Sequence, residues 1–305
     1  MQIYQKKRLV AGLSITSNII LSVLKIITGF MSGSLSIISE AIHSLSDFFA
    51  SVLTFFSVIK SSRPADNDHP YGHGKYEDMA GFIEGLLIIF ASLFIIYEAT
   101  KKIVFGVNMD AENISGIAVM FIAVIFNIIV SSLLFKVAKE SNSISLYADG
   151  EHLRTDVYSS LGVLIGLILI NITGYSILDP IIAILVAVMI FRAGYTISKK
   201  AAENLLDHSL PDENIEKMKQ IIKSYSGAVL KNDSIKARQS GPSTDIDMVL
   251  QFPESTTICA CHKICDEIEN QIRLIYPNCS ISIHSEPICY KKNCLNSCDK
   301  QHYNM

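Results

Sequence analysis

The chain has 305 residues, of which 50% are apolar and none is tryptophan, and its formal net charge is -3. This slightly acidic balance excludes a strongly basic nucleic-acid binder, and the long apolar runs exclude an ordinary soluble enzyme. These runs lie between residues 9 and 198, whereas Lys, Asp, Glu and Pro are frequent from residue 207 onward. We therefore expect a membrane domain over 1–206, a soluble domain over 207–288 and a cysteine-rich tail over 289–305.

Six apolar segments are long enough to cross a bilayer, because a transmembrane helix needs about 20 mainly apolar residues. Their approximate bounds are 9–29, 35–59, 79–100, 114–136, 144–171 and 177–198. The first segment lacks a small-residue cleavage site after it, so we interpret it as a retained span. An even number of spans places both termini on one side of the lipid bilayer. Lys and Arg flank the spans mainly on that side, which predicts a multi-pass protein of the cell membrane with both termini in the cytoplasm.

The soluble part alternates between two periodicities. Helical spacing of apolar residues covers 212–225 and 256–275, and strand-like runs cover 229–238, 244–252 and 280–284. The order αββαβ predicts an α+β sandwich, with the helices on one face of a three-stranded sheet. The expected fold is thus an all-α bundle of six transmembrane helices followed by a small cytoplasmic α+β domain.

Two apolar spans contain a histidine and an aspartate four residues apart. His43 and Asp47 lie in the second span, and His152 and Asp156 in the fifth. Residues separated by one helical turn share a face, so each pair points in one direction. A charged residue at the middle of a bilayer costs about 2.5–3.5 kcal/mol. A divalent cation bound by both pairs offsets that cost, and two imidazoles with two carboxylates suit tetrahedral zinc.

Other interpretations of these residues remain open. The pairs could be unrelated His–Asp hydrogen bonds that hold helices together, or the site of a membrane-embedded metallohydrolase. The spans could also anchor a metal sensor. Arg154 points to another helix face and is not expected to be a ligand. Glu84 in the third span is either a structural carboxyl or part of an ion path, and Gly85 beside it indicates close helix packing.

Further candidate ligands lie outside the spans. Asp66, His69 and His73 in the first loop on the cytoplasmic side could bind a metal, or could belong to a solvated turn. All seven cysteines lie in the soluble part, which argues for a reducing compartment or for metal ligands rather than secreted disulfides. Cys265 and Cys279 are expected in the core. The tail offers a possible soft-metal site at Cys289, Cys294, Cys298 and His302.

The two His–Asp pairs, the loop from Pro64 to Lys75 and the segment Arg238 to Pro242 together resemble the cation diffusion facilitator family. The resemblance implies a homodimer with a metallochaperone-like, ferredoxin-like cytoplasmic domain that exchanges cytoplasmic divalent metal for protons. It assigns transport to the two His–Asp pairs and a loop site to Asp66, His69 and His73. It also implies an ion pair between Lys75 and Asp207 across the dimer.

The same resemblance maps His262, His284 and Glu286 to ligand positions in the cytoplasmic domain. Two further positions that often hold histidine are Asn232 and Val249 here, which puts a full binuclear site in doubt.

The His-Asp/His-Asp set resembles zinc transporters within the family, and imidazole nitrogen suits Zn²⁺ better than it suits Mn²⁺. Fe²⁺, Co²⁺, Ni²⁺, Cd²⁺ and Mn²⁺ remain possible substrates. Histidine must lose its proton to bind a metal, and its unperturbed pKa of about 6.5 permits this change near neutral pH. Metal and proton therefore compete for one site, which predicts antiport.

Overall fold

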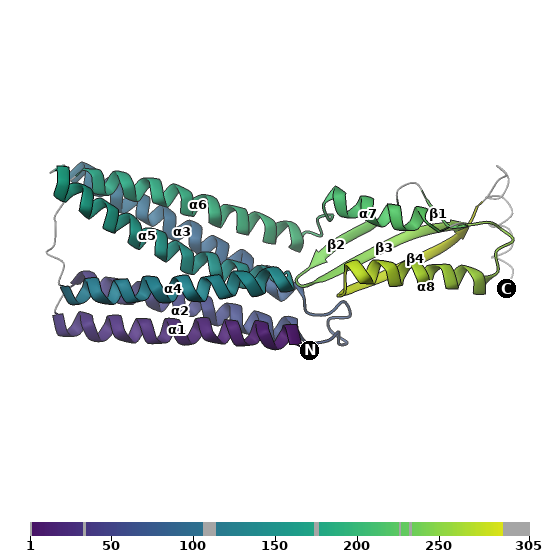
Figure 1. Cartoon of the computed structure of the whole chain (residues 1–305), viewed down its shortest axis with the longest axis horizontal. Coiled ribbons are helices and arrows are strands. Elements are labelled where there is room, and N and C mark those ends of the chain that lie inside the picture. The colour runs from purple at the N-terminus through teal and green to yellow at the C-terminus, as the bar shows by residue number, and fades with distance from the viewer. Residues whose placement is uncertain are drawn as a thin grey trace. The chain divides into compact units, whose positions relative to one another are not determined.

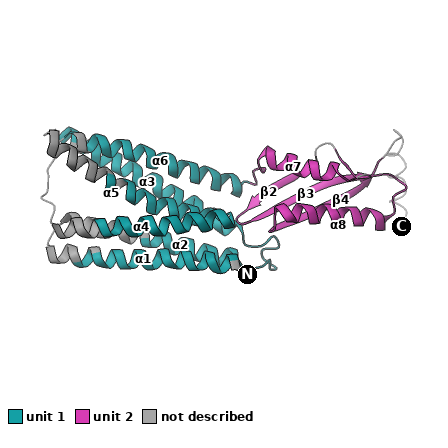
Figure 2. Ribbon diagram, viewed as in Figure 1, with its two compact units in different colours: residues 1–206 teal, residues 207–305 magenta. Residues whose placement is uncertain are grey.

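A computed structural model describes the chain except residues 1, 33–34, 106–113, 174–176, 226, 232–233 and 289–305. Within the helices, the description also excludes the side chains of 2, 25, 28–32, 35–47, 102, 114–120, 159–160, 162–173 and 178–179. The chain divides into two compact units, Met1–Leu206 and Asp207–Met305 (Figure 2).

The first unit is a bundle of long helices, each running opposite to the one before it (Figure 1). Apolar sequences form helices here because a helix satisfies its backbone hydrogen bonds internally, as a membrane interior requires. Within the described residues, four segments are long and apolar enough to span a membrane: Ile3–Leu24, Lys75–Phe105, Phe121–Ser141 and Pro180–Leu205. The helices are α1 (Gln2–Ser32), α2 (Leu35–Ser61), α3 (Lys75–Phe105), α4 (Ile114–Ser141), α5 (Ile144–Thr173) and α6 (Leu178–Leu205).

Helices α3 and α6 approach each other closely at two glycines. A Cβ atom on Gly85 would lie 2.3 Å from Ser198 Oγ, and one on Gly194 would lie 3.0 Å from the Gly85 carbonyl oxygen. No larger side chain fits at Gly85 without moving a helix, because the Ser198 backbone nitrogen would also be only 2.8 Å away. The close packing that the sequence indicated at Gly85 is therefore confirmed.

The second unit contains two helices and a four-stranded sheet (Figure 1). Strand β3 is central: β1 and β2 pair with it antiparallel, and β4 pairs with it parallel, joined through α8. The register places Ala237 opposite Ile246, and Met248 opposite Ile283. The elements are α7 (Asp212–Lys223), β1 (Val229–Leu230), β2 (Lys236–Ser240), β3 (Ser243–Phe252), α8 (Ile258–Ile275) and β4 (Cys279–Pro287).

The expected strand over 229–238 is in fact two strands, β1 and β2, which pair with successive parts of β3. A side chain interrupts the ladder between them. The backbone N–H of Val249 donates to Ser234 Oγ at 3.1 Å, and Ser234 Oγ donates to the Val249 carbonyl oxygen at 3.0 Å. The hydroxyl thus replaces a backbone partner, a competition typical of serine.

Alternation along β3 confirms that both helices cover the same face of the sheet. Ile246, Met248 and Leu250 are buried in one core with Met218 of α7 and Ile268 of α8. The intervening residues of β3 face away from this core, since successive side chains of a strand point to opposite faces.

Candidate functional site

The first His–Asp pair lies in α2, but the side chains of His43 and Asp47 are outside the described residues. The second pair is described. His152 is 6% exposed and Asp156 is half-buried, both on α5, and both interact with neighbouring groups. Arg154 lies on another face, where its guanidinium is 3.6 Å from Glu151 Oε1 and 5.0 Å from the centre of the Phe135 ring. The predicted placement of Arg154 on another helix face is therefore confirmed, and its exclusion from the ligand set stays a prediction.

A buried hydrogen-bond network connects α1, α2 and α5 one helical turn from His152. Ser51 Oγ donates to Asp149 Oδ1 at 3.0 Å, and Asn18 Nδ2 donates to Ser51 Oγ at 2.7 Å. Ser14 Oγ lies 3.0 Å from the same serine oxygen. All four side chains are buried. The network holds α2 against α5 close to the predicted transport residues.

Glu84 of α3 faces the interior of the bundle and is fully buried. Thr54 Oγ1 of α2 donates to Glu84 Oε1, while Glu84 Oε2 has no hydrogen-bond partner among the described residues. The Glu84 carboxylate also interacts electrostatically with Asp149 and His152. Glu84 therefore belongs to the same polar interior as the second His–Asp pair.

Asp149 was not recognised from the sequence, although a signal was present. It precedes His152 by three residues and Asp156 by seven, so the three side chains share one helix face. The spacing alone could not identify its partners, because Ser51 and Glu84 come from other helices.

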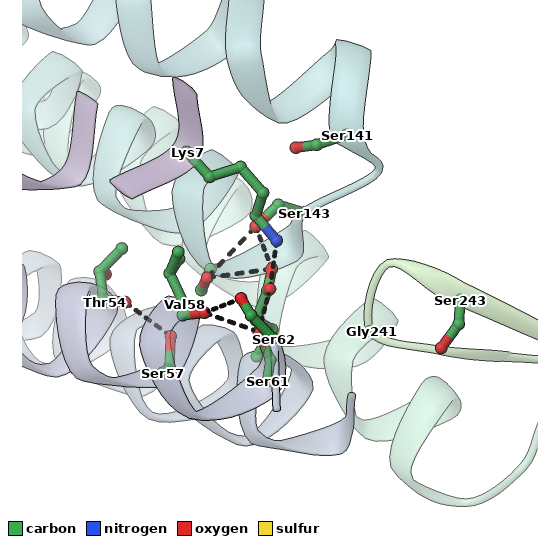
Figure 3. Close-up of polar contacts among 12 residues, drawn as sticks. Lys7, Thr54, Ser57, Val58, Ser61, Ser62, Ser141, Ser143, Gly241 and Ser243 are labelled. Carbon is green, nitrogen blue, oxygen red and sulfur yellow. Dashed lines mark hydrogen bonds and ion pairs between the residues drawn. The ribbon is translucent and has the colours of Figure 1, made fainter. Parts of the chain in front are cut away.

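A second buried cluster lies where α2 ends and α3 and α5 begin. The Lys7 ammonium forms an ion pair with Glu77 Oε1, and Ser61 Oγ donates to the same oxygen. Ser143 Oγ donates to Glu77 Oε2, and Ser145 Oγ lies 3.5 Å from it. Figure 3 shows Lys7, Ser61 and Ser143 converging on this cluster. Sequence reasoning missed it, because Lys7 and Glu77 are distant along the chain.

The loop between α2 and α3 brings three predicted ligands together. The candidate ligand atoms of Asp66, His69 and His73 all lie within 4.8 Å of one another. Asp66 Oδ1 is 3.4 Å from His69 Nδ1, and Asp66 Oδ2 is 3.3 Å from His73 Nε2. His73 is 2% exposed, and neither of its ring nitrogens has a hydrogen-bond partner among the described residues. Unsatisfied imidazole nitrogens beside a carboxylate fit a divalent metal.

The backbone of the same loop keeps Asp66 ionised. The N–H groups of His69 and Asp68 donate to Asp66 Oδ1 at 2.7 and 3.1 Å. The hydrogen bond from His69 is the main cause that lowers the pKa of Asp66 below its ordinary value. Gly72 allows the turn, with a φ of 84° that other residues rarely adopt.

The predicted ligands of the soluble unit are engaged with other groups. Lys231 Nζ donates to Glu286 Oε1 and Oε2 at 2.9 and 2.7 Å, and this pairing lowers the pKa of Glu286. His284 Nε2 is 3.9 Å from Glu286 Oε1, whereas His262 Nε2 is 3.6 Å from Asp266 Oδ2. Among the described residues of this unit, no three candidate ligands lie within 4.8 Å of one another.

Four cysteines of the soluble unit are free thiols: Cys259, Cys261, Cys265 and Cys279. Cys265 is buried in the core, as expected, whereas Cys279 is only partly buried and packs against that core. Burial raises the pKa of both thiols, which makes them poor nucleophiles. Cys261, Cys265, His262 and Glu286 line a groove of about 520 Å³. The predicted tail site at Cys289, Cys294, Cys298 and His302 lies outside the described residues.

Lys75 and Asp207, which the family resemblance pairs across a dimer, each have a partner within their own unit. Lys75 Nζ donates to the Leu205 carbonyl oxygen at 3.3 Å. Asp207 Oδ2 is 3.0 Å from Arg238 Nη1. The pair between Lys75 and Asp207 stays a prediction.

Comparison with known proteins gives matches along most of the chain. Residues 12–206 match the cation efflux transmembrane domain, and residues 210–288 match the cytoplasmic domain of cation efflux proteins. The uncharacterized transporter sll1263 of Synechocystis sp. is 30% identical over 85% of this chain and 83% of its own length. The cation-efflux pump FieF of Escherichia coli O1:K1 is 29% identical over 92% of this chain and 93% of its own.

Protein p34 of Rickettsia prowazekii is 30% identical over 91% of both chains. A solved structure of CzrB matches 27% of this chain and 100% of its own, at 25% identity and a TM-score of 0.25. The match to the transmembrane domain covers more than half of the chain and includes both His–Asp pairs. The chain therefore belongs to the cation efflux family, the cation diffusion facilitators, and is a membrane transporter rather than an enzyme.

Proposed function

We propose that this transporter exports Zn²⁺ from the cytoplasm in exchange for protons, and that His43, Asp47, His152 and Asp156 bind the ion. The Ser51–Asp149 hydrogen bond is the observation that carries the proposal. Ser51 follows Asp47 by four residues, and Asp149 precedes His152 by three. The two helices run in opposite directions. One helical turn from Ser51 to Asp47 and one helical turn from Asp149 to His152 therefore lead to the same level of the bundle.

This geometry supports a site in which the two His–Asp pairs face each other. Each helix supplies one imidazole and one carboxylate, the donor set that favours zinc. When the imidazoles are neutral the site binds metal, and when they are protonated it releases metal. An acidic compartment on the far side therefore drives release, and the protonated site carries protons back. Fe²⁺, Mn²⁺, Co²⁺, Ni²⁺ and Cd²⁺ are the alternative substrates.

Export as the direction of transport is supported by relatives such as FieF, which is named a cation-efflux pump. The basic residues at the N-terminus and in the loop before α3 support cytoplasmic termini. The match of residues 210–288 to a cytoplasmic domain agrees with this orientation. We further propose a homodimer, which light scattering of the detergent-solubilised protein would test by its mass.

Proteoliposomes loaded with a zinc-sensitive dye test the transport mechanism. With an imposed pH gradient we expect the wild type to accumulate zinc, and Asp47→Ala or Asp156→Ala to reduce uptake at least about 100-fold, since each removes one of the two charges that bind the ion. Glu151→Gln is the control, because this residue precedes His152 but contacts Arg154. Zinc uptake that needs no pH gradient would refute proton exchange. Uptake that is unchanged in the aspartate variants would refute the proposed transport site.

A further inference from the structure

Two buried carboxylates lie next to the proposed transport site without belonging to it. Glu84 of α3 and Asp149 of α5 are both fully buried. They interact electrostatically with each other, and Glu84 also interacts with His152. Two like charges in a membrane interior are strongly unfavourable unless a cation or a proton compensates for them.

One face of α2 supplies a hydroxyl group to each carboxylate. Ser51 and Thr54 are three residues apart, so their side chains lie on the same side of the helix. Ser51 donates to Asp149 Oδ1, and Thr54 donates to Glu84 Oε1. Four oxygen-bearing side chains from three helices therefore converge in the bundle.

The buried Glu84 Oε2 is the feature that points to a ligand. It has no hydrogen-bond partner among the described residues, although its carboxylate is fully buried. Two strong bases among the described residues of the bundle have other partners: Lys7 pairs with Glu77, and Arg154 with Glu151. A buried oxygen with unused lone pairs beside a second carboxylate is suited to a metal cation.

We propose that Glu84, Asp149, Thr54 and Ser51 form a second cation site, made only of oxygen donors, one helical turn from the transport site. Oxygen ligands suit harder cations such as Mn²⁺ and Mg²⁺, whereas imidazole suits zinc. The second site therefore accepts divalent cations with little discrimination, and the His–Asp pairs select among them. A role of the second site in supplying cations to the His–Asp pairs rests on the proposed function, but the binding of a cation at the second site does not.

Binding of Mn²⁺ to the full-length protein in detergent tests the site. The electron paramagnetic resonance signal of free Mn²⁺ measures how many ions each chain binds. We expect Glu84→Gln and Asp149→Asn each to remove one bound Mn²⁺ or weaken its binding at least about tenfold. Glu98→Gln is the matched control, since Glu98 is on the same helix but lies beside Lys101 at the bundle exterior. It should bind as the wild type does.

Thr54→Val keeps both carboxylates and the side-chain shape, and should weaken Mn²⁺ binding less than Glu84→Gln does. Thr54→Val also provides a test of the site if Glu84→Gln fails to fold. Unchanged Mn²⁺ binding in Glu84→Gln and Thr54→Val would overturn the proposal. It would mean that the carboxyl groups of Glu84 and Asp149 share a proton instead.

The His152→Ala variant separates this proposal from the proposed function. We expect it to lose zinc transport and to retain the Mn²⁺ ion. Loss of the Mn²⁺ ion in His152→Ala would show that there is one site and not two. Retained zinc transport in that variant would refute the proposed transport site, while the Mn²⁺ count in Glu84→Gln would still decide the second site.

Discussion

The two units of the molecule distribute charge in opposite ways. The core of the soluble unit is apolar, formed by residues such as Met218, Ile246 and Ile268, and its ion pairs lie at the surface. In the helical unit, large apolar side chains such as Phe90 and Leu185 are exposed, while several charged residues, such as Lys7 and Glu84, are buried inside.

This contrast follows from the solvent. Water stabilises the charges of the soluble unit wherever they lie on its surface, so their positions there indicate little about function. Lipid stabilises none, so each buried charge of the bundle must have a partner within the protein or a ligand. Lys7 and Glu77 form an ion pair with each other. The polar interior near His152 instead contains two carboxylates, those of Glu84 and Asp149. Buried charge therefore identifies candidate sites in one unit and not in the other.

Glu77→Ala should give the largest effect on stability, because it leaves the buried Lys7 ammonium without its carboxylate. Breaking a buried pair costs about 3–5 kcal/mol. Thermal unfolding in detergent should show a clearly lowered midpoint. Lys6→Ala is the control, since Lys6 pairs with Glu140 at an exposed position, and it should change stability by less than about 1 kcal/mol. Equal midpoints for the two variants would mean that the buried pair stabilises the fold no more than the exposed pair does.

His69→Ala should give an intermediate effect, on metal binding in the half-exposed loop. We expect zinc affinity of the loop to fall at least about tenfold, or about 1.4 kcal/mol, measured by calorimetry in a His152→Ala background. Asp68→Ala is the control, because only the backbone of Asp68 contacts Asp66. If both variants bind zinc equally, the loop is a turn without a metal.

The ionisation of Asp66 bears on how zinc binding by this loop depends on pH. The pKa of Asp66 is lowered, chiefly by the His69 N–H group, so this carboxylate remains ionised in mild acid. Release of zinc as the pH falls from 7 to 5 would therefore not come from protonation of this carboxylate. Release only at a much lower pH would assign the binding to carboxylates alone.

Lys231→Ala should give the smallest effect, because its pair with Glu286 lies at the surface. The pKa of Glu286 is lowered in the folded state, so the pair stabilises the fold above the carboxyl's unfolded pKa and ceases to do so as the pH falls through the lowered value. Thermal unfolding should show a loss of at most about 1 kcal/mol at pH 7, and a smaller loss as the pH falls through the lowered pKa of Glu286. The exposed Lys263→Ala is the control. A deficit that grows in acid would refute this assignment.

Local patterns predicted much of the fold. Apolar runs indicated the helices of the bundle, and alternation of polar and apolar residues located β3. The split between β1 and β2 could not be foreseen, because it depends on the Ser234 hydroxyl reaching Val249 across the sheet. The proximity of the three candidate loop ligands was predictable, since Asp66, His69 and His73 are close in sequence and a short turn brings them together. That they bind a metal stays a prediction.

The sequence by itself determined most of the helices and strands, and which residues bear metal-binding groups. These properties depend on spacing within a few residues and on transfer between water and lipid. Only the tertiary structure decided that Ser51 reaches Asp149, 98 positions away, and that Lys7 reaches Glu77, 70 positions away. Such partners depend on which helix faces pack together. Packing among all the helices determines these faces, including close contacts such as Gly85 against Ser198.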